Sequence, residues 1–273
     1  MKTVTNHALR SWLILLLALI FGVVSLAAAH EKTPVSGTKR GAVLAKKDEG
    51  IFLAESDAAM MTMMKGMSIT PSGNVDRDFV ALMIPHHQGA IDMAESELRF
   101  TRSEQLLRIA QEIVIEQLQE ISAMRIAIGD KVSPSEARLA ASDPGFAVQI
   151  TLSLATRSGT SARSLAAEAP FLAENNAAMT KMMSDMSVRP TDNVDRDFVK
   201  MMVPHHQGAI DMAQIELHYG RDEQLRRIAQ EIIVDQMQEI ALMRIAIGEA
   251  LPASVAAPTD PSRNNLYQSH VTR

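Results

Sequence analysis

Two nearly identical stretches place adjacent histidines among methionines. MIPHHQGAIDMA occupies residues 83–94, and MVPHHQGAIDMA occupies residues 202–213. Imidazole nitrogen and thioether sulfur both bind metals, and thioethers select Cu(I), or Ag(I) as its mimic. Zinc rarely takes methionine, and calcium and magnesium prefer oxygen ligands. The stretches therefore indicate copper, with Cu(I) preferred and Cu(II) possible, since imidazole suits both oxidation states.

The competing interpretation is a hydrophobic core. A methionine stripe at helical spacing is more often packing than ligand, because methionine fills irregular gaps well. Here, however, the histidines form an adjacent pair, the pair is duplicated, and thioethers surround it. The chain holds 18 methionines, 8 histidines and no cysteine, which excludes disulfides and thiolate metal sites. We therefore favour the metal site.

The chain contains a tandem duplication. Residues 74–99 match residues 193–218 at 20 of 26 positions, and residues 103–129 match residues 222–248 at 19 of 27, with one offset of 119. Such a repeat is the first feature to interpret in a sequence. Because every candidate ligand is duplicated, we expect each half to carry its own copper sites.

Each copy is predicted to form three helices, at about 54–67, 74–99 and 103–129 in the first copy. Asn74 and Ser103 are good N-cap residues, and Gly129 suits the position after a helix end. No segment alternates with period two for long enough to require a strand. The fold class is therefore all-α, with two repeats of about three helices joined by a Ser/Ala-rich linker that holds at most one short helix.

The N-terminal end of the chain is predicted to be a signal peptide for export, and the C-terminal end a disordered tail. Lys2 and Arg10 precede an apolar run at 13–24, and Ala27 and Ala29 allow signal-peptide cleavage before His30. That run is short for a membrane span, which needs roughly 20 residues, although an uncleaved anchor is the alternative. The predicted domains are a signal peptide (1–29), a flexible segment (30–53), the first repeat (54–130), a linker (131–172), the second repeat (173–250) and a disordered tail (251–273). We expect a periplasmic or secreted protein that is not an integral membrane protein after cleavage.

Helical periodicity assigns the candidate ligands to single faces. The second helix is predicted to turn inward Phe79, Met83, His86, His87, Ala90, Met93, Ala94 and Glu97, and outward Asp78, Gln88, Asp92, Glu95 and Ser96. The first helix carries a methionine stripe of Met60, Met63, Met64 and Met67, repeated as Met179, Met182, Met183 and Met186. Met83 and His87, one turn apart, can chelate one ion, whereas His86 and Met93 lie about 10 Å apart along the axis. More than one copper per copy is therefore plausible, with ligands from facing helices.

Polar residues interrupt the apolar stripe of the third helix. Gln117 and Glu120 fall in its middle, as do Gln236 and Glu239 in the second copy. Burying one such group without a partner costs roughly 1–3 kcal/mol. We expect the histidines of the second helix to be their partners.

Proline precedes each histidine pair, at Pro85 and Pro204. A proline inside a helix removes one backbone hydrogen bond and usually kinks the helix, which would re-aim the imidazoles. Alternatively, a new helix begins at the proline, which is a favoured first-turn residue. The sequence leaves both possibilities open.

The methionine-rich first helix, DRDFV…M.PHHQGAIDMA and L..IAQEI…Q..EI..MR resemble the domain of unknown function 305 family, and within it the CopM-like periplasmic copper-binding proteins. The resemblance covers about residues 54–129 and 173–248. It implies a ferritin-like helical bundle, an extracytoplasmic location and a role in copper binding or resistance. It also implies metal ligands at Met83, His86, His87, Met93 and Met124, and at Met202, His205, His206, Met212 and Met243. One departure concerns Ile126 and Ile245, where many relatives have tryptophan, so aromatic packing over the metal is not expected.

The sequence thus predicts a copper-binding protein rather than an enzyme. It would sequester or carry Cu(I), with a copper exporter or another periplasmic carrier as a possible partner; no run of Lys or Arg suggests nucleic acid. One alternative is a di-iron carboxylate oxidoreductase built on residues such as Glu97, Glu112, Glu116 and Glu120. That chemistry expects Glu-x-x-His motifs, which the sequence lacks. The other alternative is a metal-free helical interaction module.

Overall fold

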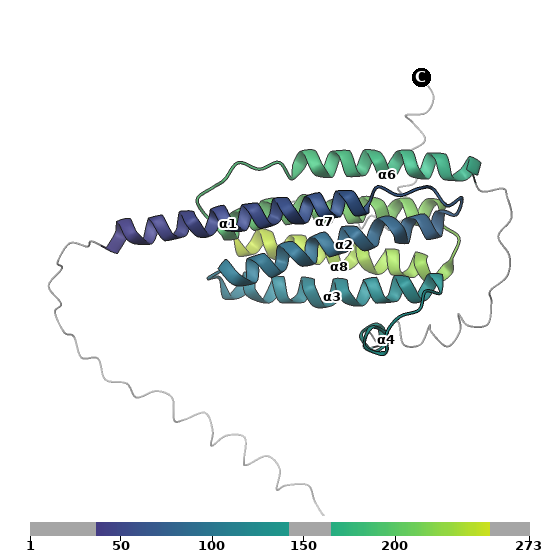
Figure 1. The fold of residues 1–273 in the computed structure, drawn as a ribbon, viewed down its shortest axis with the longest axis horizontal. Helices are drawn as coiled ribbons and strands as arrows, with labels where there is room; N and C mark the ends of the chain where they lie inside the picture. The colour runs from purple at the N-terminus through teal and green to yellow at the C-terminus, as the bar shows by residue number, and fades with distance from the viewer. Residues whose placement is uncertain (1–36, 142–164, 252–273) are drawn as a thin grey trace, which may run out of the picture. The chain divides into compact units, whose positions relative to one another are not determined.

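The computed structural model describes residues 37–141 and 165–251, and all regular structure in these residues is helical. The elements are α1 (Gly37–Gly66), α2 (Val75–Phe100), α3 (Glu104–Ile128), α4 (Pro134–Ala141), α6 (Leu165–Asp185), α7 (Val194–Tyr219) and α8 (Glu223–Ala246) (Figure 1). The prediction of an all-α chain with two three-helix repeats is confirmed, the repeats being α1–α3 and α6–α8. None of the described helices is long and apolar enough to cross a membrane. The predicted signal peptide and its cleavage site lie outside the described residues, as does nearly all of the predicted tail.

Side-chain caps define where the central helices begin. The side chain of Asn74 accepts a hydrogen bond from the backbone of Arg77 at the start of α2, and Asn193 does the same for α7. Ser103 caps α3 in the same way. Gly129 ends α3 with φ of 80°, a left-handed conformation that glycine adopts without steric cost. The predicted boundaries of these helices are therefore correct to within one or two residues.

The first helix of each repeat is longer than predicted. We expected α1 to begin near residue 54 and α6 near residue 173, but they begin at Gly37 and Leu165. The segment predicted as flexible is thus helical from residue 37, and the linker contains α4 as well as the start of α6. Phe52 and Phe171 account for part of the difference, because each is fully buried and extends the core contact about two turns before the methionine stripe.

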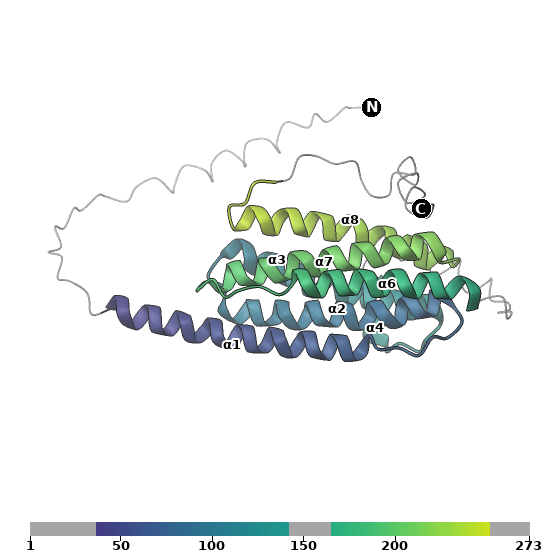
Figure 2. The ribbon, with the colours of Figure 1, turned by 90° about the horizontal axis from the view of Figure 1, so that it is seen from above.

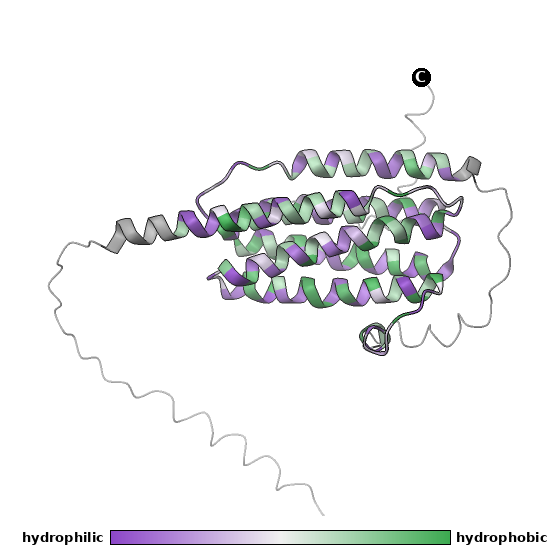
Figure 3. Ribbon diagram, in the orientation of Figure 1, coloured by the Kyte–Doolittle hydropathy of each residue, from purple (hydrophilic) through white to green (hydrophobic). Residues whose placement is uncertain are grey.

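The two repeats pack against each other. Within each repeat, α2 contacts α3 and α7 contacts α8, and between repeats α2 contacts α7 and α3 contacts α8. Helices α1 and α6 lie alongside this group (Figure 2). Where their residues are coloured, the helices carry both apolar and polar residues, as expected for helices with one buried face (Figure 3). The core therefore runs across both repeats, and the candidate ligands of the two copies face a common interior.

Reciprocal contacts at the helix ends show that α2 and α7 are antiparallel. The Asp76 carboxylate, near the start of α2, accepts hydrogen bonds from the backbone N–H groups of Arg221 and Asp222, just beyond the end of α7, at 2.8 and 2.9 Å. Burial, reinforced by the charge of Asp76, raises the pKa of Glu216 to about 9. At the other end, burial and the charge of Asp195 raise the pKa of Glu97 to about 9. The repeats are thus related by an approximate two-fold axis between α2 and α7.

Both central helices continue through their prolines. Pro85 lies inside α2 and Pro204 inside α7, so the possibility that a new helix begins at the proline is wrong. Gly66, at the end of α1, allows close packing here, because a Cβ atom on it would lie 2.6 Å from the Pro85 Cβ. The proline ring is therefore part of the contact between α1 and α2.

The predicted inward face of α2 is confirmed, since all eight of its residues are buried. Two residues predicted to face outward are also buried, namely Asp78 and Ser96. Asp78 accepts hydrogen bonds from the backbone N–H of Ser72, and the Ser96 hydroxyl donates to Glu55 on α1 at 2.6 Å. The outward prediction failed for these two because local polar partners compensate their burial.

Candidate metal centre

Four imidazoles form a row through the interior of the bundle. The ring centroids of His86 and His205 are 3.9 Å apart across the two repeats. His87 continues the row at 6.2 Å from His86, and His206 continues it at 6.2 Å from His205. All four side chains are fully buried. The duplicated motif thus produces one histidine cluster rather than two separate pairs.

Each inner histidine meets a thioether from the other repeat. His86 Nε2 lies 3.2 Å from the Sδ atom of Met182 on α6, and His205 Nε2 lies 3.3 Å from the Sδ atom of Met63 on α1. Metal–nitrogen and metal–sulfur bonds of about 2.0 and 2.3 Å at a tetrahedral angle put the two donors about 3.5 Å apart. The observed separations are close to that value. We call His86, His205, Met63 and Met182 the central cluster.

The inner imidazoles are neutral. Burial, followed by the proximity of other histidines, lowers the pKa of His86 and of His205 well below the ordinary value. A neutral imidazole keeps one nitrogen lone pair for a metal. The Nδ1 atoms of His86 and His205 are buried without a hydrogen-bond partner. The central cluster therefore presents two neutral nitrogen donors and two neutral sulfur donors, all shielded from water.

The outer histidines are held by glutamates of the third helices. His87 Nε2 lies 2.7 Å from Glu120, and His206 Nε2 lies 2.7 Å from Glu239. Burial lowers the pKa of His87 to about 3, opposed by the charge of Glu239, so this imidazole is neutral beside Glu120. His206 Nε2 is hydrogen-bonded to Glu239, whereas neither ring nitrogen of His87 has a hydrogen-bond partner. A carboxylate beside a ring nitrogen is typical of the surroundings of metal-binding histidines.

The predicted partnership between the third helices and the histidines is confirmed for the glutamates only. The side-chain amides of Gln117 and Gln236 are buried, and their oxygen and nitrogen atoms have no protein hydrogen-bond partner. Burial raises the pKa of Glu116 to about 8, and the charges of Glu239 and Asp235 add to this shift. Both of these acidic residues belong to the second repeat, so Glu116 lies close to that repeat. The region between α3 and α8 is thus polar and acidic, beside the histidine row.

The predicted methionine ligands divide by burial. The buried members are Met63, Met67, Met83, Met93 and Met124 of the first repeat and Met182, Met186, Met202, Met212 and Met243 of the second. The partly buried members are Met60, Met64, Met179 and Met183. The structure pairs only Met63 and Met182 directly with an imidazole nitrogen, and each pair joins the two repeats. Neither repeat therefore contains a complete inner His–Met pair, which differs from the expectation of self-contained halves.

Two glycines create the space for these thioethers, and sequence reasoning missed them. A Cβ atom on Gly89 would lie 3.0 Å from the Sδ atom of Met63, and one on Gly208 would lie 2.6 Å from the Sδ atom of Met182. Each methionine therefore crosses the α2 or α7 backbone at a glycine to reach the histidine of the other repeat. The signal available in the sequence was the glycine shared by both PHHQG motifs, two residues after the second histidine.

Harder ligands do not converge to the same degree. Among residues 37–141 and 165–251, no group of three or more histidine, aspartate or glutamate side chains is arranged to hold a metal ion. The donor set that the fold does bring together is mixed nitrogen and sulfur. That set suits soft ions such as Cu(I).

Comparison with known proteins identifies the family. The model of the domain of unknown function (DUF305) matches residues 25–128 and again residues 149–247. No curated protein matches the chain, and no solved structure does. The family match does not distinguish the CopM-like branch from other members. The two matches cover well over half of the chain, which therefore belongs to the DUF305 family and carries its domain in two tandem copies.

Proposed function

We propose that this protein binds Cu(I), and Ag(I) as its mimic, at the central cluster, and that it sequesters or carries the ion. The observation that carries the proposal is the pairing of each inner imidazole with a thioether at 3.2–3.3 Å inside a fully buried site. As a purely structural contact, each thioether would be only a weak hydrogen-bond acceptor for its imidazole.

The charge of the donors favours Cu(I) over Cu(II). All four donors of the central cluster are neutral, and the desolvation cost of a buried ion grows with the square of its charge. A singly charged soft ion is therefore the less costly occupant, and thioethers also prefer it. The Glu120 and Glu239 carboxylates, held against the outer histidines, offset the added positive charge from a short distance.

The N-terminal sequence supports a role outside the cytoplasm. The basic residues, short apolar run and Ala-x-Ala site suit an exported protein. In that compartment a Cu(I) carrier would contribute to copper tolerance or homeostasis, and its partner would be a copper exporter or another periplasmic copper carrier. No turnover is part of this proposal.

Replacing His86 and His205 together by glutamine tests the proposal. Glutamine remains polar and similar in size but offers no imidazole lone pair, so Cu(I) affinity should fall by about 100-fold while helicity is kept. The measurement is competition of the full chain with a chromophoric Cu(I) chelator under anaerobic, reducing conditions, with circular dichroism on the same samples. His218→Gln is the matched control, because His218 is an exposed histidine on α7. Parental affinity in the double variant would show that the central cluster does not bind copper.

Alanine at Gly89 and Gly208 should separate copper affinity from stability. The new methyl groups would push the thioethers of Met63 and Met182 away from the imidazoles, so Cu(I) affinity should fall by about tenfold or more. Alanine favours a helix over glycine by about 1 kcal/mol, which offsets the displacement of two flexible side chains in the apo protein. Chelator competition and thermal unfolding measure the two effects.

Gly50→Ala is the control for this pair, since a Cβ atom there meets nothing within 4 Å. It should gain helix stability without changing Cu(I) affinity. Unchanged affinity in the Gly89→Ala, Gly208→Ala variant would mean that the thioethers need not lie where the structure places them.

A further inference from the structure

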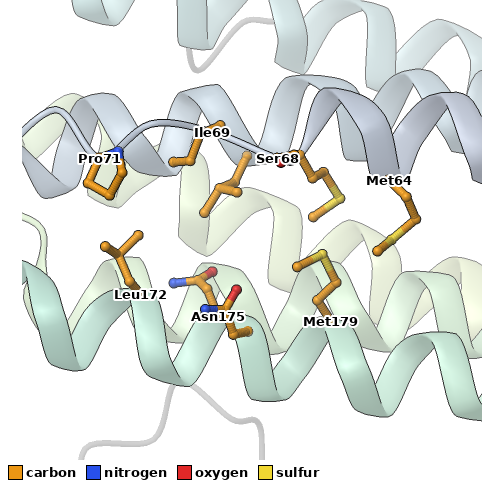
Figure 4. A pocket seen from close by; sticks show the side chains of 10 residues that line it. Met64, Ser68, Ile69, Pro71, Leu172, Asn175 and Met179 are labelled. Atoms are coloured by element: carbon orange, nitrogen blue, oxygen red, sulfur yellow. The ribbon is translucent and has the colours of Figure 1, made fainter.

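A second group of thioethers lines a pocket that contains none of the central-cluster residues. The pocket has a volume of about 430 Å³ and lies between the end of α1 with its following loop and α6. Three methionines line it, Met64 and Met67 from α1 and Met179 from α6. Met64 and Met179 point towards one another across it (Figure 4). Because these two are partly buried whereas Met67 is buried, the pocket leads from the surface inward.

An unsatisfied polar atom argues that the pocket is not simply apolar packing. Asn175, on the wall formed by α6, is only 3% exposed. Its Nδ2 donates to the backbone carbonyl of Phe171 at 2.8 Å, but its Oδ1 is buried without a hydrogen-bond partner. Leaving such an oxygen unpaired costs about 1–3 kcal/mol, so an occupant that donates a hydrogen bond is favoured. A water molecule carried by a metal ion is such a donor.

Two methionines of the pocket are close in sequence to the two methionines of the central cluster. Met64 follows Met63, and Met179 precedes Met182 by three residues, about 4.5 Å along the helix axis. Along α6, the thioether that faces His86 therefore lies about one helical turn from a thioether of the pocket. Transfer of an ion from the pocket to the central cluster exchanges thioether ligands for thioether and imidazole ligands, with no change in the charge of the ion.

From these observations we infer that the pocket is a capture site for hydrated Cu(I) or Ag(I). Met64, Met67 and Met179 are the ligands, Asn175 Oδ1 accepts a hydrogen bond from the ion's water, and the ion then passes to the central cluster. The passage inward rests on the proposed function of that cluster, whereas capture in the pocket does not. The sites differ in donor type, because the pocket offers sulfur without imidazole.

The test uses Ag(I), which undergoes no redox change, and the full chain with Met64, Met67 and Met179 all replaced by leucine. Leucine nearly preserves methionine volume, so the fold is expected to remain intact. Stopped-flow loading of the central cluster should slow by about tenfold or more, and calorimetry should lose the weaker Ag(I) equivalent and keep the tight one. Met61→Leu is the control, because Met61 lies on α1 but is 68% exposed and outside the pocket. If the triple variant unfolds, Met64→Leu alone, at a partly buried position, is measured in its place.

The glutamine variant of His86 and His205 distinguishes the two proposals. It should lose the tight Ag(I) equivalent and keep the weaker one. If the leucine variant loads at the parental rate and with parental stoichiometry, the pocket is packing and the capture site is refuted, although the central cluster stands. If the glutamine variant keeps the tight equivalent, the central cluster is refuted, and loss of the weaker equivalent in the leucine variant still supports capture in the pocket.

Discussion

Leucine in place of both Met63 and Met182 is expected to weaken Cu(I) and Ag(I) binding by about 100-fold, while thermal unfolding changes by only a few degrees. Each substitution removes the thioether that faces an imidazole at 3.2–3.3 Å and leaves a side chain of nearly the same volume. Met-to-Leu exchanges in a core usually cost less than about 1.5 kcal/mol, whereas two lost metal ligands at about 1.4 kcal/mol each amount to two powers of ten in affinity. Preference for Cu(I) should decline with the affinity, because only sulfur has been removed.

The matched control is Met201→Leu. Met201 is a buried methionine of α7, and the equivalent position of α2 is already leucine, Leu82. This substitution therefore removes a buried thioether at a site where the fold is known to accept leucine. Chelator competition and thermal unfolding should both give parental values for it. If the Met63→Leu, Met182→Leu variant also binds Cu(I) as the parent does, both methionines are packing residues and the copper interpretation of the PHHQG motif is wrong.

The helices and their buried faces could be predicted from the sequence because both depend on local rules. Asn74 and Ser103 cap helices wherever they precede an apolar pattern, and period 3.6 places His86, His87 and Glu97 on one face without knowledge of the neighbours. The contact between His87 and Glu120 also followed from a general cost, since a partly buried glutamate in an apolar stripe needs a partner. These predictions required no information about which helix packs against which.

The cross-repeat pairing could not be predicted, and the duplication itself is the reason. Because the two copies share the same faces, a pairing of Met63 with His86 and a pairing of Met63 with His205 satisfy the same periodicity. The choice depends on the antiparallel packing of α2 against α7, which arises from contacts such as that of Asp76 with the end of α7. Those contacts join polar residues that are far apart in the sequence and that the sequence pattern would place on the surface. No local pattern indicates them. The glycines at 89 and 208 were missed for a related reason, because a helix interior gives no sign of a side chain crossing it.

The pairing can be measured in a chain that retains one inner histidine. In the His205→Gln background, the structure leaves His86 with Met182 as the one complete inner His–Met pair. Adding Met182→Leu should then reduce the remaining Cu(I) affinity by about tenfold or more, because the thioether that faces His86 is gone. Adding Met63→Leu to the same background should reduce it less, since the imidazole that Met63 faces has already been removed.

The two double variants carry equivalent substitutions on equivalent helices, so each controls for the other in stability and helicity. Pairing within a repeat would give the opposite result, with the larger loss in the Met63→Leu variant. Equal losses in both variants would mean that His86 is not paired preferentially with either thioether. Only a larger loss in the Met182→Leu variant agrees with His–Met pairs that join the repeats, and that result would mean that the duplicated domain binds its metal across the boundary between its copies.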